Sequence, residues 1–305
     1  MKTKSLVNAA IMLAIYMVFF VLYNIGVLPT IMSILLPIPL IVYSVATQKI
    51  RDVIWLLLGC FVGTFLMGSI YGLVTTLNYG VIGAVIGIGI IKKWPYWQRL
   101  LNAAIVSVIS FPITTYVLTG LNVQQSMKQV IDELFAMMQS MTQMLPESSV
   151  EVLNHFQNMM SMMMTTLLPT ILILVGLVSA FLSDKVATLV LRRMNFEVPK
   201  GEDIQGFQLG SKLAIILLVS QILVSFITNH TLSVILLNTV MLLNTLFLFQ
   251  GAIVMMAYFK SRNQKGIGIV LLVFSLMSSL SMFISVLGIS DALFNYRERF
   301  AIKKT

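Results

Sequence analysis

The chain has 305 residues, of which 58% are hydrophobic and only 10% are charged, and its mean hydropathy is +0.95. A soluble domain carries roughly 25% charged residues, so the composition excludes an ordinary water-soluble fold. The formal net charge of +9 comes without a basic stripe interleaved with aromatic residues, so nucleic acid is not expected as a partner. Cys60 is the single cysteine, which excludes a disulfide framework and a cysteine metal site.

Apolar runs, separated by charges or by Pro and Asn, follow one another from end to end. A helix of about 20 apolar residues crosses a bilayer and satisfies its own backbone there. The expected fold is therefore all-α: a polytopic, multi-pass transmembrane helical bundle in a bacterial cell membrane, with the lipid bilayer as its first partner. About nine spans are predicted from hydropathy, at residues 6–28, 31–47, 53–71, 79–91, 100–120, 165–190, 211–228, 232–259 and 267–289.

The basic residues predict how the chain is oriented. With a cytoplasmic N-terminus, nearly all of them fall at the inner face, among them Lys49, Lys92 and Arg192. The C-terminal tail, which contains Arg297 and Lys304, disagrees, because an odd number of spans would place it outside. Either the last segment is re-entrant, or the chain has eight spans, or the tail is an exception to the rule.

Residues 121–164 form the one long insertion with many polar residues. Two capping boxes, Ser126 with Gln129 and Ser148 with Glu151, predict a pair of amphipathic helices at the outer face. Ten of the 21 methionines fall here, which leaves two interpretations: a flexible apolar face or a Cu(I) site built from thioethers. The first is favoured because no cysteine or histidine cluster joins them.

The two histidines suggest no metal site. His155 and His230 are each isolated in the sequence and are expected to be solvated, so no metal and no cofactor is predicted.

Two GxxxG patterns predict close helix packing, although glycine is also common in membrane helices. They are formed by Gly59 with Gly63 and by Gly83 with Gly87.

The irregular stretch between the third and fourth spans is the best candidate for a ligand site. Irregular backbone at membrane depth occurs where protein or a water-filled cavity satisfies it, so a small-molecule pocket near the outer face is predicted. An interfacial aromatic belt would also explain the tyrosines. The candidate residues are Tyr71, Thr75, Thr76, Asn78 and Tyr79, with Tyr23 and Asn24 from the first helix.

Catalytic motifs are missing from the sequence. It contains no Walker loop, no HExxH and no paired catalytic Ser and His, so an enzyme is not expected. A series of carboxylates within the spans, which an ion-driven pump needs, is missing as well.

The N-terminal sequence, Lys2-Thr3-Lys4-Ser5-Leu6 followed by Ala10-Ile11-Met12-Leu13-Ala14, resembles the first helix of the S components of energy-coupling factor transporters. The resemblance implies that Ala10 and Ala14 contact a transmembrane T subunit that works with ATPases. It also implies that a solute binds near the outer face of a six-helix bundle. Residues 1–194 are then an S-component-like unit that includes the outer helical hairpin 121–164.

Residues 191–207 and 288–297 look like the YybS-like integral membrane proteins of Gram-positive bacteria, a family whose domain has no assigned function. Residues 195–305 form the remaining region, with about three spans and a basic tail. We expect a membrane protein that binds a small solute as part of a transporter. The alternative is a membrane scaffold or regulatory subunit that transports nothing.

Overall fold

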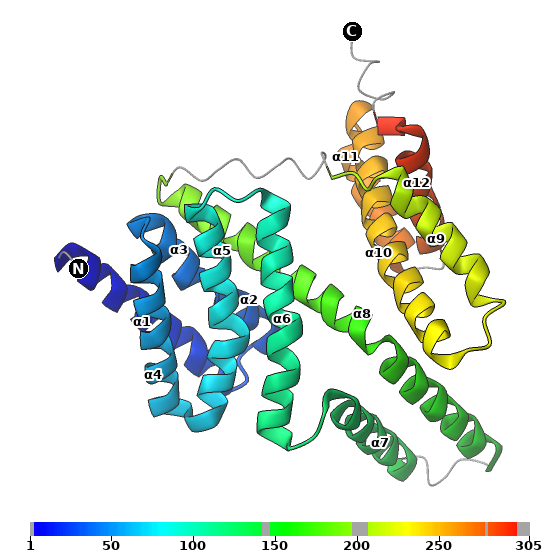
Figure 1. Cartoon of the computed structure of the whole chain (residues 1–305), viewed down its shortest axis with the longest axis horizontal. Coiled ribbons are helices and arrows are strands. Elements are labelled where there is room, and N and C mark those ends of the chain that lie inside the picture. The colour runs from blue at the N-terminus through cyan, green and yellow to red at the C-terminus, as the bar shows by residue number, and fades with distance from the viewer. Residues whose placement is uncertain (1–2, 142–146, 197–206, 278–279, 298–305) are drawn as a thin grey trace. The chain divides into compact units, whose positions relative to one another are not determined.

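The computed structural model describes residues 3–141, 147–196, 207–277 and 280–297 (Figure 1). Within these ranges every element is a helix and no strand occurs, which confirms the all-α expectation. In the described part, six helical segments are long and apolar enough to cross a membrane, and three shorter apolar helices accompany them. The chain is thus a polytopic helical membrane bundle.

The chain divides into two compact units, Met1–Pro199 and Lys200–Thr305. The boundary expected from the sequence follows residue 194. The first unit contains α1 (Thr3–Asn24), α2 (Pro29–Leu35), α3 (Ile38–Thr47), α4 (Ile50–Thr75), η1 (Thr76–Gly80), α5 (Val81–Ile91), α6 (Tyr96–Thr119), α7 (Val123–Met141) and α8 (Glu147–Arg193). The second contains α9 (Ser211–Val224), α10 (His230–Ser261), α11 (Lys265–Met277) and α12 (Ser281–Phe294).

Helix α3 lies in the core of the first unit. All its residues from Ile38 to Val45 are buried, as expected for a short helix that is apolar on every side. Its side chains join two apolar clusters. One includes Ile86, Leu100 and Leu191, and the other includes Tyr16 from α1. The helices that surround α3 are therefore held by contacts with one central element.

The chain reverses direction at Ser69, whose φ of 51° and ψ of −136° are not helical. The side-chain oxygens of Thr64 and Thr76 lie 2.8 Å apart, whereas twelve residues of straight helix would separate them by about 18 Å. Gly72 makes the reversal compact, because a Cβ there would collide with the backbone carbonyl of Thr64. The spans predicted at residues 53–71 and 79–91 are therefore separated by a reversal, which lies at Ser69 near the end of the first.

The two GxxxG patterns pack against different helices. A Cβ at Gly83 would collide with the backbone of Pro37, and one at Gly87 with the side chain of Ser44, so α5 lies directly on α3. Gly59 and Gly63 face side chains of α1 instead, and a Cβ at Gly59 would lie at an ordinary 3.6 Å from a methyl of Leu13. The close approach between helices therefore occurs at the pattern of Gly83 and Gly87, where α5 meets α3.

Helix α8 is one continuous helix of 47 residues, which joins the second helix of the predicted hairpin to the following span. At 1.5 Å per residue it is about 70 Å long, more than twice the hydrocarbon thickness of a bilayer. Helix α7 packs along its N-terminal half: the rings of Phe135 and Phe156 are 5.9 Å apart, and Gln157 donates a hydrogen bond of 2.9 Å to Asp132. The hairpin is thus α7 with the first half of α8.

The cap of α7 differs from the prediction. The backbone N–H of Gln125 donates to Asn122 Oδ1 at 2.9 Å, and the N–H of Asn122 donates to Gln125 Oε1 at 3.2 Å. This reciprocal pair is the capping box, formed four residues before the predicted Ser126 and Gln129. The predicted Ser148 box lies outside the side chains that the structure describes.

In the second unit, the segment 267–289 is not a single span. Ser285 of α12 donates to Asn244 of α10, and Asp291 of α12 accepts from Gln250 of α10. Later residues of α12 thus contact later residues of α10, so the two helices run parallel. Helix α11 starts next to the end of α10 and runs back along it. Since α11 and α12 have 13 and 14 residues, each spans about 20 Å. Together the two short helices return Arg297 towards the end of α10 that carries Lys260.

The parallel contact of α10 and α12 depends on two glycines. A Cβ at Gly251 would collide with the carbonyl of Ile284, and a Cβ at Gly288 with the carbonyl of Phe247. Small residues at such a crossing let membrane helices approach backbone to backbone. Because these glycines lie on different helices, no GxxxG spacing marks them in the sequence.

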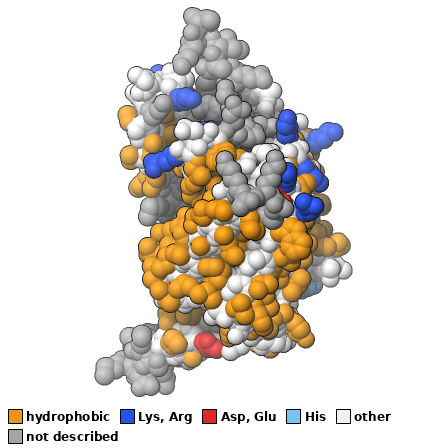
Figure 2. All heavy atoms as spheres, turned by 90° about the vertical axis from the view of Figure 1, so that its left-hand side faces the viewer, with side chains coloured by type: hydrophobic (Ala, Val, Ile, Leu, Met, Phe, Trp, Pro, Cys, Tyr) orange, Lys and Arg blue, Asp and Glu red, His pale blue; other side chains and the backbone are white. Residues whose placement is uncertain are grey.

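The outer surface of α1 and α4 is apolar (Figure 2). Large apolar side chains are exposed there, with Ile11 at 51% and Val62 at 60% of their full area. A soluble monomer rarely leaves such a continuous apolar surface in water, whereas a lipid-facing surface requires it. The exposed face therefore places this unit in a lipid bilayer.

Candidate functional site

The first unit contains a partly open cavity of about 480 Å³, with Tyr71 and Asn24 exposed at its rim. This volume falls within the range of roughly 300–1,000 Å³ that small-molecule sites occupy. Six of the seven residues predicted to bind a ligand line it, namely Tyr23, Asn24, Tyr71, Thr75, Asn78 and Tyr79. Three elements, α1, α4 and η1, bring these side chains to one place.

Thr76, the seventh predicted residue, lies behind the cavity wall. It is fully buried, accepts a hydrogen bond of 3.2 Å from the hydroxyl of Tyr16 and lies 2.8 Å from the hydroxyl of Thr64. Residues two positions apart in a helix differ by about 200° around its axis. Thr76 and Asn78 therefore point in nearly opposite directions. Thr76 therefore anchors the segment instead of lining the cavity.

Asn78 and Tyr79 belong to η1, a π-helical segment between α4 and α5. Single π-helical turns are rare and are frequent at functional sites. Here the segment turns both side chains towards the cavity, where the rings of Tyr79 and Tyr23 meet edge to face with centroids 5.6 Å apart.

Helix α6 supplies a wall that the sequence analysis missed. The amide nitrogen of Asn78 donates to Thr114 Oγ1 at 3.1 Å, and further hydroxyl groups of the same face line the cavity. These residues are Ser107, Ser110, Thr114 and Thr115. Their spacing of three, four and seven residues is typical of one helix face, a signal that could have identified the wall.

Helix α8 supplies a further wall. Leu168, Leu172 and Val175 line the cavity, and Gly176 lies so close to α6 that a Cβ would be 3.0 Å from the Cβ of Ser107. Of the predicted outer hairpin, the described residue that reaches the cavity is Met127 at the start of α7. The lining is therefore mostly apolar, with hydroxyl and amide groups on the faces of α1, η1 and α6.

The cavity has no charged lining residue among the residues that the structure describes. One buried ion pair of this unit lies nearer the opposite end of α6, where Arg99 Nη2 and Asp184 Oδ1 are 3.4 Å apart. Lys185 lies over the ring of Tyr96 at the same end. Asp52 at the start of α4 is buried as well and accepts a hydrogen bond from Ser5. The cavity is thus an electrically neutral compartment.

The predicted partner-contact residues Ala10 and Ala14 do not reach the cavity. Both are exposed on α1, on the face that also carries Val7, Ile11 and Val18. The two alanines are small side chains on a face of otherwise bulky apolar residues. They lie where a second membrane helix, or lipid, makes contact.

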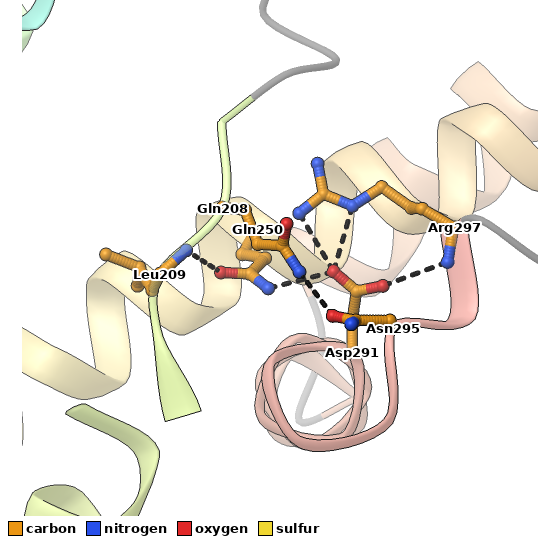
Figure 3. Close-up of polar contacts among 6 residues, drawn as sticks. All are labelled: Gln208, Leu209, Gln250, Asp291, Asn295 and Arg297. Atoms are coloured by element: carbon orange, nitrogen blue, oxygen red, sulfur yellow. Dashed lines mark hydrogen bonds and ion pairs between the residues drawn. The ribbon is translucent and has the colours of Figure 1, made fainter. Parts of the chain in front are cut away.

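The second unit contains a buried polar network (Figure 3). Asp291 is fully buried and forms an ion pair of 2.8 Å with Arg297 Nη2. It also accepts hydrogen bonds from Gln250 and from Nε of Arg297 at 2.8 Å. Gln250 in turn accepts from the backbone N–H of Leu209 at 2.8 Å. Because the carboxylate has several partners, this cluster joins the segment before α9, helix α10 and the chain after α12.

No group of three or more His, Cys, Asp or Glu side chains capable of holding a metal ion occurs in the described parts of the chain. His155 and His230 are exposed. Methionine side chains of the hairpin are exposed as well, including Met137, Met138, Met159, Met162 and Met163. The flexible apolar face and the Cu(I) site both remain hypotheses for them.

The fold and the cavity define a polytopic helical membrane protein with a neutral internal compartment. The family described as "Predicted membrane protein (DUF2232)" matches residues 11–292, so the chain belongs to this family. It is similar to the "Uncharacterized protein YybS" of Bacillus subtilis (strain 168), at 22% identity over 314 residues that cover 98% of this chain and 99% of the relative. No solved structure matches the chain. The YybS-like membership expected from the sequence is confirmed, while these comparisons do not extend to S components.

Proposed function

We propose that the protein binds a small solute in the cavity between α1, η1, α6 and α8, as the solute-binding component of a membrane transport system. The observation that carries the proposal is the convergence of Tyr23, Asn24, Tyr71, Thr75, Asn78 and Tyr79 on one cavity. A scaffold without a ligand has no need of such a space and would fill it with apolar side chains, as protein interiors are close-packed.

The construction of the wall supports binding further. A π-helical segment and a reversal at a residue with positive φ interrupt the helices beside the cavity. Such backbone irregularities persist where the surrounding structure holds them, and they cluster at ligand sites. Asn78 lies within this π-helical segment and lines the cavity, so the irregular backbone and the polar side chains occur at the same place.

We further propose that the N-terminus is cytoplasmic and that the cavity lies towards the outer face of the cell membrane. The turns that carry Lys49, Lys92 and Arg192 all lie at the end of the first unit opposite to Tyr23 and Tyr79. Basic residues stay preferentially on the cytoplasmic side. We also infer that α11 and α12 form a re-entrant pair, which places Arg297 on the side of Lys260 and agrees with this orientation.

The exposed apolar surfaces support a second candidate function, a membrane scaffold. Helix α7 and the first half of α8 expose methionine and other apolar side chains, such as Met138 at 46% and Val152 at 70%. Flexible methionine surfaces adapt to several partners. Under this alternative the protein holds other membrane proteins and transports nothing.

Capture of solutes by the full-length protein tests the first proposal. The protein in lipid nanodiscs is exposed to a metabolite extract of its host and then analysed by native mass spectrometry. We expect a bound solute with wild type that Thr114→Val weakens at least tenfold. The matched control is Thr239→Val, because Thr239 is a threonine of the second unit that also donates to its own helix. No bound solute, or equal loss in both variants, would refute the proposal.

A further inference from the structure

The geometry points to an uncharged ligand that presents hydrogen-bond donors, such as N–H groups, on a flat ring. This inference rests on the proposed solute-binding function and names the chemical class that the cavity accepts. It follows from the charge of the lining, from the direction in which its polar groups already point, and from the aromatic side chains at one end.

The charge of the ligand follows from the lining. No described residue around the cavity is acidic, basic or histidine. A buried ion without a counter-charge is strongly disfavoured in a medium of low dielectric constant. Arg99 and Asp184 pair with each other elsewhere in the unit and do not line the cavity. A neutral molecule is therefore the one that can leave water for this cavity.

Three threonine hydroxyl groups of the wall already donate their hydrogens within the protein. Thr75 donates to the carbonyl of Tyr71 at 2.8 Å, and Thr114 and Thr115 both donate to the carbonyl of Phe111 at 2.9 Å. Each hydroxyl has one hydrogen and two lone pairs. What these threonines offer to a ligand is therefore hydrogen-bond acceptors.

The two lining amides each use one N–H within the protein and keep the second N–H and the oxygen for a ligand. Asn24 donates through Nδ2 to the carbonyl of Phe20 at 2.9 Å, and Asn78 donates through Nδ2 to Thr114 at 3.1 Å. Oδ1 of Asn78 is 3.4 Å from the hydroxyl of Thr114, which is longer than an ordinary O–H···O bond. The amide oxygen of Asn78 is a strong acceptor without a close donor. A ligand N–H group can therefore donate a hydrogen bond to it.

The aromatic side chains favour a flat ligand. Tyr23 and Tyr79 lie edge to face with an interplanar angle of 66°, and Phe111 lines the cavity with them. Aromatic rings favour offset or edge contacts with a further ring. A planar ring with N–H groups on its edge satisfies both the apolar walls and the acceptors.

A series of four compounds with one ring tests the assignment on the full-length protein in nanodiscs. Benzamide is neutral with two N–H donors, N,N-dimethylbenzamide is neutral without them, benzoate is an anion and benzamidine is a cation. Binding is measured by saturation-transfer NMR. We expect benzamide to bind at least tenfold more tightly than each of the other three. Equal or tighter binding of dimethylbenzamide, benzoate or benzamidine would overturn the assignment.

A variant makes the test specific to the cavity. Asn78→Asp keeps the size of the side chain and adds a negative charge, so the preference should move from benzamide to benzamidine by at least tenfold. Glu133→Gln, on the exposed face of α7, should leave the series unchanged. If Asn78→Asp does not fold, the series on wild type decides the question.

The outcome also separates this inference from the proposed function. If neither the four compounds nor the metabolite extract yields a bound molecule, both fall. If the extract yields a charged solute that Thr114→Val displaces, the proposed function stands and the ligand class is wrong. If it yields a neutral solute with N–H or O–H donors, both are supported.

Discussion

The side-chain amide of Asn78 donates a hydrogen bond of 3.1 Å to Thr114, a residue 36 positions further along the chain. This bond joins the π-helical segment η1 to α6 and thereby connects two walls of the cavity. It also orients the amide, so that its oxygen remains available to a ligand.

Removal of this contact should destabilise the first unit. We expect Thr114→Val to lower the free energy of unfolding by about 1–3 kcal/mol, because the partly buried amide of Asn78 loses its partner. Thr115→Val is the control, since Thr115 makes the same bond to the carbonyl of Phe111 but none to Asn78. Thermal unfolding of both variants in one detergent measures the difference. Equal melting temperatures would show that the Asn78 contact adds nothing to stability.

The same substitution, glycine to alanine, should change the melting temperature differently in the two GxxxG patterns. Gly87→Ala places a methyl group against Ser44 of α3, and such overpacking costs about 1–3 kcal/mol. Gly59→Ala meets an ordinary contact with Leu13, and alanine is the better helix former by up to about 1 kcal/mol. We therefore expect a lower melting temperature for Gly87→Ala and an unchanged or higher one for Gly59→Ala. The opposite order would contradict the packing described here.

The polar network of the second unit should depend on the charge of Asp291. Asp291→Asn removes the counter-ion of Arg297 inside a buried cluster, a change that costs on the order of 3–5 kcal/mol. We expect loosening of the chain after α12, detected as faster tryptic cleavage at Arg297. Asp132→Asn, on the exposed face of α7, provides the control. Unchanged cleavage in Asp291→Asn would mean that the ion pair does not hold the tail.

The proposed topology predicts which positions a membrane-impermeant maleimide reaches in intact cells. In a background with Cys60→Ser, Glu133→Cys should react, whereas Lys92→Cys and Arg262→Cys should react after permeabilisation. A cysteine added after Thr305 should behave like Lys92→Cys, because the re-entrant pair returns the tail to the inner side. Labelling of that added cysteine in intact cells would contradict the re-entrant arrangement.

Substitutions at Ala10 and Ala14 test whether a T subunit, the partner implied by the resemblance to S components, contacts α1. If a T subunit with its ATPases docks on α1, Ala10→Leu combined with Ala14→Leu should abolish co-purification of these proteins. The melting temperature should stay the same, because both side chains are exposed. Val7→Leu, a change on the same face, should preserve the complex. Recovery of unrelated membrane proteins by wild type and by all variants would favour the scaffold.

The sequence alone determined the class of protein and most of one side of the cavity. Apolar run length specifies membrane helices because each helix satisfies its own backbone, so no knowledge of neighbours is needed. Tyr71, Thr75, Asn78 and Tyr79 were identifiable because polar side chains and glycines interrupt an apolar run locally. The misplaced residue, Thr76, shows the limit: adjacent residues of one helix face different surroundings.

Tertiary structure alone decided the reversal at Ser69, the contribution of α6 to the cavity, the contact between Gly251 and Gly288, and the return of α12 along α10. Each depends on residues that are distant in the sequence. In a membrane the surface that faces lipid is as apolar as the surface that faces another helix, so hydropathy does not distinguish them. Backbone approach and hydrogen bonds between helices make that distinction, and they exist once the helices are packed.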